Sequence, residues 1–348
     1  MVLYIKVEDS MGLAEFIKTH IEEINSNNFT EVYKDALNSL SHVWYENTVG
    51  KLTEIFLDAG IKPLEYMQAV PDNYLAKSKI TSVEIPDNVK SIGNEAFFFC
   101  SELTSVTIPS SVTSIGSSAF RTCERLKSVT IPDSVTYIGD NAFTCCYELT
   151  SVTISNSLTS LSSSVFNRCT GLKSVKIPDS VTSIGEYAFS FCSGLTSTVI
   201  PNSVTSIGNG AFYNCTGLES ITLPNSVTSI GSFVFFGCSG LTSITIPASV
   251  TSIGQYAFNG CTGLTSVTIS DNITRINDSL FGGCKQLKSI TIPKSVTKIG
   301  YSAFWGCSGL TITFNGTMAE WKAIDKESKW KYASSKFTIH CIDGDLKE

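Results

Sequence analysis

The sequence predicts an α/β repeat fold, in which a curved solenoid with parallel strands on its concave side joins a small helical N-terminal region to a C-terminal cap. From about Ile80 to about Leu310 the chain repeats every 23 residues, and the register does not shift. Ten units share a cysteine, a phenylalanine three residues before it and a leucine three residues after it. The cysteine column consists of Cys100, Cys123, Cys146, Cys169, Cys192, Cys215, Cys238, Cys261, Cys284 and Cys307.

The first half of each unit is expected to form a short strand. In one example, Leu218, Ile221 and Leu223 follow the spacing L-x-x-L-x-L, and the last two alternate as on one face of a strand. Pro224 then ends the strand because proline has no N–H to give to a ladder. Neighbouring units must stack to bury the apolar side that a single unit leaves open.

The second half of the unit is expected to turn and return. Gly231 is predicted to supply a turn that would strain most other residues. Val234, Phe235 and Cys238 have the spacing that places them on one side of a short helical turn. Each unit is therefore predicted to be a strand, a turn and a helical return.

The two ends of the chain do not follow the repeat. Residues 1–79 contain three stretches of apolar residues with helical spacing, which begin at Leu13, Val32 and Val49. This region is either a cap on the N-terminal edge of the solenoid or a separate binding module. Residues 311–348 are predicted to form a C-terminal cap, whose tryptophans cover the last open face of the stack.

Two units of the solenoid at 80–310 depart from the repeat together. Ser155 and Ser270 replace the proline, while Ser162 and Asn277 replace the glycine. Because these units lie five repeats apart, the pattern indicates duplication of a five-unit block. A functional bend at these two places is the alternative interpretation.

Composition argues against several classes of partner. Charged residues make up 16% of the chain and its net charge is −6, so a nucleic-acid partner, which needs clustered Lys and Arg, is not expected. No run of apolar residues is long enough for a transmembrane helix, and membrane insertion is not expected. The first ten residues do not have the pattern of a secretion signal, so the chain is expected to stay where it is made unless another route exports it; its final location is unknown.

No catalytic site, cofactor site or metal site is predicted. The cysteine column has the spacing of the repeat rather than that of paired zinc ligands, and its thiols are expected on the buried side of each unit. Cys145 and Cys341 are the better candidates for exposed thiols. The three histidines lie outside the array, and no phosphate-binding loop is present. The chain is therefore predicted not to be an enzyme.

Two surfaces are candidates for binding. Aromatic residues outside the invariant columns are predicted to line one flank of the later repeats, where they either anchor a partner or shield the seams between units. These residues are Tyr187, Phe191, Tyr213, Phe233, Phe236, Tyr256, Tyr301 and Trp305. The concave strands carry hydroxyls and four lysines, which either attract an acidic partner or belong to a solvated sheet face. The lysines are Lys127, Lys173, Lys176 and Lys288.

The repeat resembles a known family. The unit from Ile177 to Ser197, with the sequence IPDSVTSIGEYAFSFCSGLTS, is similar to units of BspA-like leucine-rich-repeat proteins. The resemblance covers about Ile80 to Leu310 and implies a leucine-rich-repeat solenoid. It also implies a surface protein of bacteria or mucosal protists that adheres to host matrix proteins and cells, and it supplies no catalytic residues.

Three functional hypotheses follow. The first is an adhesion-type solenoid that binds a protein or a glycan through its flank or concave face. The second is an intracellular inhibitor or scaffold, for example one encoded by a phage or mobile element, which engages its target through residues 1–79. The third is a structural spacer in a larger assembly. The fold alone does not choose among them, because repeat proteins share a core and vary their surfaces.

Overall fold

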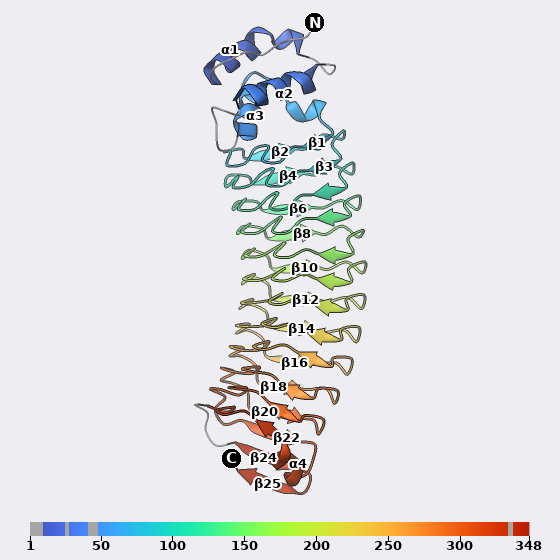
Figure 1. The fold of residues 1–348 in the computed structure, drawn as a ribbon, viewed down its shortest axis with the longest axis vertical. Helices are drawn as coiled ribbons and strands as arrows, with labels where there is room; N and C mark the ends of the chain where they lie inside the picture. The colour runs from blue at the N-terminus through green and yellow to red at the C-terminus, as the bar shows by residue number, and fades with distance from the viewer. Residues whose placement is uncertain (1–9, 25–27, 41–47, 333–336, 348) are drawn as a thin grey trace.

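The structure, a computed structural model, describes residues 10–24, 28–40, 48–332 and 337–347. It is a stack of coils, each one 23-residue unit, that forms a long and gently bent column with a helical region at its N-terminal end (Figure 1). The predicted fold class is confirmed. The helices are α1 (Ser10–Thr19), η1 (Ile21–Glu23), α2 (Phe29–Leu40), α3 (Thr48–Asp58), η2 (Pro63–Tyr66) and α4 (Met318–Ala323).

Two ladders of parallel strands run along the column. The first ladder contains the predicted strands, and in its regular part paired strands align residues 23 positions apart, as Ser174 does with Ser197. The pairing is interrupted before β10 and before β16. Its members are β2 (Ser82–Glu84), β4 (Ser105–Thr107), β6 (Ser128–Thr130), β8 (Ser151–Thr153), β10 (Ser174–Lys176), β12 (Ser197–Val199), β14 (Ser220–Thr222), β16 (Ser243–Thr245), β18 (Ser266–Thr268), β20 (Ser289–Ile292), β22 (Thr311–Phe314) and β24 (Thr338–Cys341), followed by the antiparallel β25 (Gly344–Lys347).

The second ladder, which was not predicted, lies at the two residues before the glycine position of each unit, most often serine and isoleucine. Its two-residue strands are β1 (Ala69–Val70), β3 (Ser91–Ile92), β5 (Ser114–Ile115), β7 (Tyr137–Ile138), β9 (Ser160–Leu161), β11 (Ser183–Ile184), β13 (Ser206–Ile207), β15 (Ser229–Ile230), β17 (Ser252–Ile253), β19 (Arg275–Ile276), β21 (Lys298–Ile299) and β23 (Asp325–Lys326). It is interrupted before β9 and before β19. These are the strands that end next to Ser162 and Asn277, so the two irregular units interrupt this ladder.

The return segment is a run of turns instead of the short helical turn suggested by spacing. The N–H groups of Glu95, Phe97 and Phe99 donate to carbonyls of the next coil, at 2.8–2.9 Å. The intervening Phe98 donates to Glu95, three residues earlier, at 2.9 Å. Two positions per unit have positive φ, as Glu95 (54°) and Phe99 (59°) show. Because alternate N–H groups bond between coils, the segment cannot form the i to i−4 bonds of a helix.

The glycine of the repeat has a different role from the one predicted. Gly231 is not among the glycines with positive φ, so the strain of a left-handed turn does not select it. A Cβ at Gly185 would instead lie 2.6 Å from the Leu161 oxygen and 2.7 Å from the Ser162 carbonyl carbon. In these regular coils glycine is needed because the backbone of the preceding coil passes too close for a side chain.

The core of the solenoid is a continuous stack of phenylalanine rings. Rings in adjacent coils have centroids 5.1–5.7 Å apart and interplanar angles of 4–16°. Tyr74 ends the stack edge-on against Phe97 at 6.2 Å, and Trp330 does the same against Phe304 at 6.0 Å. Trp330 itself is buried, so an aromatic ring covers each end of the stack.

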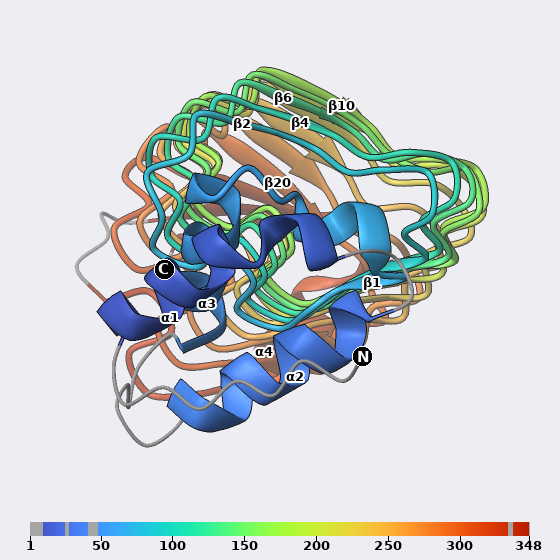
Figure 2. The same ribbon diagram turned by 90° about the horizontal axis from the view of Figure 1, so that it is seen from above.

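The N-terminal region has a core of its own. The helices α1, α2 and α3 form over the three predicted stretches, and their buried side chains make a cluster separate from that of the solenoid. Figure 2 shows these helices lying across the N-terminal end of the stack. Residues 1–9, which the expectation about a secretion signal concerns, lie outside the described residues. No helix in the described part of the chain is long and apolar enough to cross a membrane.

Candidate binding surfaces

Six of the eight predicted aromatic residues form one connected set of ring contacts. Tyr213 stacks on Phe236 with centroids 4.8 Å apart and planes at 2°, and Phe233 stacks on Tyr256 at 4.9 Å and 3°. Phe233 and Phe236, at 6.0 Å, join the two pairs. Phe191 and Tyr187 also contact Tyr213, at 5.3 and 6.5 Å. We call this set the aromatic flank: Tyr187, Phe191, Tyr213, Phe233, Phe236 and Tyr256.

The turn geometry of the return segment places these rings outside the core. Tyr187, Phe233 and Tyr256 occupy the first positive-φ position of their units, with φ of 54°, 59° and 59°. The next residue in each unit, such as Val234 after Phe233, is buried. Because the chain turns sharply at this position, the aromatic ring projects outward while its neighbour enters the core. Side chains in equivalent columns of adjacent coils then meet on the surface.

The aromatic flank presents ring edges more than ring faces. Tyr187 is 39% exposed, whereas the five other rings are half-buried by one another. The faces that meet within the two stacked pairs are covered, and the Arg168 guanidinium lies 4.6 Å from the centroid of the Phe191 ring. The rings therefore cover one another in part, and together they leave an accessible apolar strip with hydroxyls and one cation at its end.

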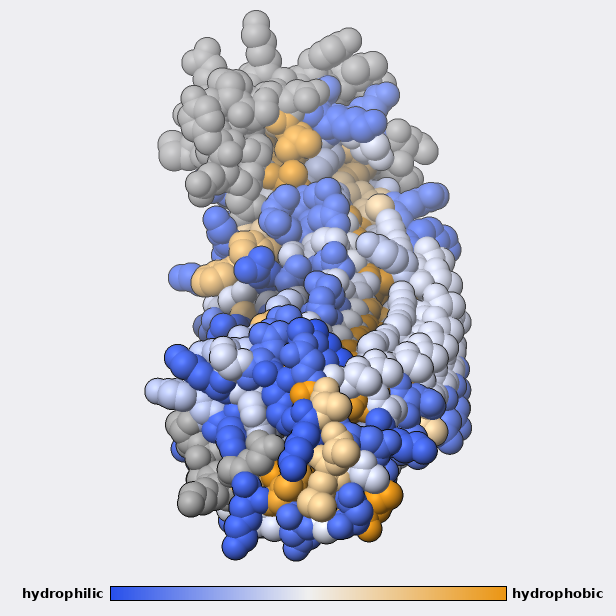
Figure 3. Space-filling view, turned by 60° about the horizontal axis from the view of Figure 1, so that its bottom comes forward, coloured by the Kyte–Doolittle hydropathy of each residue, from blue (hydrophilic) through white to orange (hydrophobic). Residues whose placement is uncertain are grey.

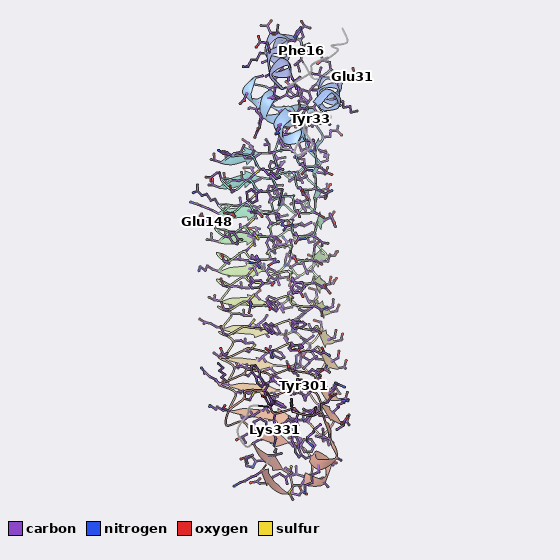
Figure 4. The ribbon with its side chains drawn as sticks, turned by 60° about the vertical axis from the view of Figure 1, so that its left-hand side comes forward. Phe16, Glu31, Tyr33, Glu148, Tyr301 and Lys331 are labelled. Atoms are coloured by element: carbon purple, nitrogen blue, oxygen red, sulfur yellow. The ribbon has the colours of Figure 1, made fainter. Side chains whose placement is uncertain are left out.

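The structure does not bring the remaining two aromatic candidates into this set. Tyr301 and Trp305 are 43% and 44% exposed, and they contact no ring of the flank. Figure 4 places Tyr301 on the side of the stack toward its C-terminal end. They form a separate exposed pair of residues near the last coils.

The four predicted lysines are all exposed on the first ladder, but they do not form one patch. Lys173 and Lys176 belong to the same coil, beside and within β10. Lys127 lies two coils earlier and Lys288 five coils later. Pale rows of weakly polar residues run along one side of the stack in Figure 3. This distribution favours local contacts at Lys173 and Lys176 over a continuous basic surface.

The columns near these lysines contain an exposed residue that sequence reasoning missed. In β12 the usual order of apolar then polar residues is reversed, so Thr198 is buried and Val199 is 73% exposed. The Thr198 hydroxyl donates to the Val175 carbonyl at 3.1 Å, which satisfies it inside the core. Val199 and Lys176 line a shallow hollow of about 430 Å³ between β10 and β12. The reversed pair was the available signal in the sequence.

The cysteine column is buried, and its thiols have a definite partner. Each thiol donates to a carbonyl of the preceding coil, as Cys215 does to Phe189 at 3.0 Å. Burial raises the pKa of these thiols, that of Cys192 to about 12, although the hydrogen bond acts in the opposite direction. All twelve cysteines are free thiols, and within the described ranges no three His, Cys, Asp or Glu side chains gather as a metal site.

Thiol labelling should separate these cysteines into two classes. Cys145 and Cys341 are half-exposed, whereas the other ten thiols are buried and remain protonated at neutral pH. Because only an accessible thiolate reacts, we expect a thiol-specific reagent to label two of the twelve cysteines in the folded chain and all twelve after denaturation. Mass spectrometry of labelled peptides measures this. Rapid labelling of Cys215 without denaturant would contradict the buried column.

These features define a non-globular repeat protein of the leucine-rich-repeat class, whose variable surface residues lie on an invariant core. The sequence matches the family described as BspA type leucine-rich repeat region over residues 68–196 and 182–311, and the chain belongs to this family. Among curated proteins, none matches the chain. The match begins at the residue before β1, where the second ladder also begins.

Solved structures similar to this chain include bacterial leucine-rich-repeat proteins. A leucine-rich cell-surface protein from Faecalibacterium prausnitzii A2-165 is 36% identical, with 75% of this chain and 86% of that chain covered and a TM-score of 0.47. A leucine-rich-repeat protein from Bacteroides ovatus ATCC 8483 is 29% identical, with coverage of 75% and 84% and a TM-score of 0.44. The pneumococcal vaccine antigen PcpA is 23% identical, with coverage of 81% and 72%, and its TM-score of 0.55 supports the fold.

Proposed function

We propose that this protein is a non-enzymatic, adhesion-type repeat protein that binds another macromolecule through the aromatic flank. The observation that carries the proposal is the connected set of six rings, which crosses adjacent coils and leaves Tyr187 exposed. Aromatic side chains are the usual anchors of protein interfaces. Similarity to a leucine-rich cell-surface protein supports an extracellular role for the binding.

The geometry of the flank favours a protein over a glycan as its partner. A sugar ring stacks on an open aromatic face, but the facing sides of Tyr213 and Phe236 are covered by each other at 4.8 Å. The edges, together with the Tyr187 and Tyr213 hydroxyls, can contact apolar and polar groups of a protein surface. Arg168 adds a cation at the end of this strip, which suits a carboxylate on the partner.

The test measures binding of the full chain to immobilised extracellular-matrix proteins and to mucin. We expect saturable binding to at least one matrix protein. The double variant Tyr213→Ser and Phe236→Ser removes one stacked pair and should weaken this binding at least about tenfold, since interface anchors typically contribute 2 kcal/mol or more. Thermal unfolding of the same variant verifies that the phenylalanine core remains folded.

A matched control removes aromatic surface elsewhere on the molecule. Tyr137 and Tyr332 are 56% and 55% exposed, and neither contacts the flank. The variant Tyr137→Ser and Tyr332→Ser should therefore bind like the unchanged chain. Equal loss in both variants would refute a specific role for the flank, and no binding by the full chain to any matrix protein would favour the scaffold or spacer hypotheses.

A further inference from the structure

The first ladder begins one coil later than the second ladder. In the second ladder β1 pairs with β3, but among the described residues no strand precedes β2 in the first ladder. The residues 23 positions before β2 are 59–61, where the chain leaves α3 through Gly60 with a φ of 84°. The end of α3 therefore lies where the repeat would otherwise put a strand. As a result β2, just below α3 in Figure 1, is an edge strand.

The outer side of β2 offers backbone hydrogen-bonding groups. On the inner side, Ile85 donates to the Thr107 carbonyl at 3.1 Å, and the Thr81 carbonyl accepts from Thr104 at 2.8 Å. Backbone groups of successive residues in a parallel strand point to opposite sides. The N–H and C=O of Glu84, next to Ile85, are therefore directed away from β4. An extended peptide chain can form hydrogen bonds with the outward backbone groups of an edge strand.

A hollow of about 500 Å³ lies against this open edge. Its apolar walls come from three parts of the chain, with Leu57 of α3, Leu64 of η2, and Leu75 and Ile80 of the first coil. Val83 also lines it and is only half-buried, although it packs against the solenoid core. An apolar side chain from an added strand would cover Val83 and displace water from these walls.

Hydrogen bonds hold the walls of the hollow in place. The Asn88 side-chain amide donates to the carbonyls of Leu64 at 2.8 Å and Met67 at 2.5 Å. In the repeat this position is usually a serine, which reaches only the preceding coil, as Ser111 does to Val89 at 2.7 Å. Asparagine in the first unit therefore ties η2 to the solenoid. The hollow is preformed, which lowers the entropic cost of filling it.

The charges at the edge select the kind of peptide. Three charged side chains line the hollow: Lys62, Glu65 and Glu84. Lys62 and Glu65 form an ion pair with each other at 3.5 Å. The Glu84 carboxylate is exposed on β2, and the structure records no ion pair for it among the described residues. A lysine or arginine on the added strand would meet this carboxylate as a cross-strand pair.

We propose that the open edge of β2 is a second binding site, which accepts an extended basic segment of a partner protein as an added strand. The backbone of the segment bonds to Glu84, an apolar side chain enters the hollow beside Leu57 and Leu64, and a neighbouring basic side chain pairs with the Glu84 carboxylate. This site lies at the junction of the helical region and the solenoid. It is independent of the aromatic flank, and it gives residues 48–85 a role in recognition.

The test uses a fluorescein-labelled peptide in which valine alternates with lysine and threonine, and a matched peptide with glutamate in place of lysine. We expect the full chain to bind the lysine peptide at least about tenfold more tightly. Glu84→Pro should abolish binding, because proline removes the outward N–H without removing a bond to β4. Glu84→Lys should reverse the preference between the peptides. Hydrogen exchange should show that the lysine peptide slows exchange at the Glu84 amide.

The controls separate this site from other surfaces. Glu219→Lys makes the same charge change beside β14, which lies in the middle of the stack in contact with both β12 and β16, and should leave both affinities unchanged. The Tyr213→Ser and Phe236→Ser variant should also bind the peptide normally, so failure of the flank proposal would not affect this result. The proposal is overturned if neither peptide binds, if Glu84→Lys keeps the original preference, or if the unliganded chain dimerises through β2 and excludes the peptide. If the Glu84→Pro variant does not fold, the peptide preference of Glu84→Lys and the hydrogen exchange of the Glu84 amide still test the proposal.

Discussion

Raising the pH from about 8 to about 11 is expected to unfold the solenoid, because its core contains ten buried thiols. Burial raises the pKa of every thiol in the column, that of Cys192 and that of Cys307 to about 12. An unfolded cysteine ionises near pH 8.5. Above that pH the unfolded chain releases protons that the folded chain retains, so the free energy of unfolding decreases as the pH rises toward the folded pKa.

The size of this effect follows from the number of thiols. Each contributes roughly 1 kcal/mol per pH unit above the unfolded pKa, so ten thiols together contribute on the order of 10 kcal/mol per pH unit. This is comparable to the whole stability of a typical domain. Burial also raises the pKa of Tyr33 to about 12, which adds a smaller effect in the same direction. Far-ultraviolet circular dichroism under reducing conditions measures the transition.

The cysteine column can be tested separately from other alkaline effects. Replacing Cys215, Cys238 and Cys261 by alanine removes three titrating groups and leaves Tyr33 and the lysines in place. We expect this variant to have a shallower dependence of stability on pH above about pH 9 than the unchanged chain, although it is less stable at neutral pH. Identical slopes for the two proteins would show that the thiols do not control alkaline unfolding.

Replacing Gly208 by serine is expected to lower the free energy of unfolding by about 3 kcal/mol. A Cβ at Gly208 would lie 2.7 Å from the Glu186 nitrogen and 2.9 Å from the Gly185 carbonyl carbon. Both atoms belong to the backbone of the preceding coil, so no side-chain rotation relieves the contact. The two coils must move apart, which weakens the pairing of β11 with β13. Urea unfolding of the variant and the unchanged chain measures the difference.

The matched control is Ser162→Gly, because Ser162 already stands at the position that glycine has in most other units. The second ladder is interrupted between β7 and β9, and the Ser162 hydroxyl donates to the Ile138 carbonyl. In regular coils the backbone N–H of the glycine donates to the equivalent carbonyl, as the Gly185 N–H does to the Leu161 carbonyl at 2.8 Å. Ser162→Gly should therefore change stability by less than about 1 kcal/mol, since the backbone can take over the bond. A cost at Ser162 as large as that at Gly208 would contradict this steric explanation.

In the two irregular units, the residues that replace proline and glycine bond to the preceding coil. Asn277 donates its side-chain amide to the Ile253 carbonyl at 2.5 Å, as Ser162 does to Ile138. Ser155 and Ser270, at the proline position, donate to Val135 and Val250 at 2.6 and 3.1 Å. Each of these four side chains thus donates a hydrogen bond to the preceding coil. The sequence located these units, but only the contacts between coils reveal how the ladder closes around them.

The sequence alone determined the repeat, the columns that form the core, the burial of the cysteines and the helices of the N-terminal region. These properties follow from its period, because residues 23 positions apart occupy equivalent environments in successive coils. A column of phenylalanines at that spacing must stack if the coils stack. The exposed aromatic candidates could be identified in the same way, as the residues that vary between units.

The tertiary structure decided which of those residues meet, because many contacts between coils do not join equivalent positions. The Cys215 thiol reaches the Phe189 carbonyl, 26 residues earlier, and the Glu95 N–H reaches Ser117, 22 residues later. In the flank, the contacts of Phe191 and Tyr187 with Tyr213 are offset in this way, whereas the two stacked pairs join equivalent positions. The close approach of Gly208 to the Glu186 backbone, 22 residues earlier, is also offset. The open edge of β2 depends on where α3 ends against the first coil. A repeat identifies equivalent residues, whereas the path of the chain between equivalents determines its contacts.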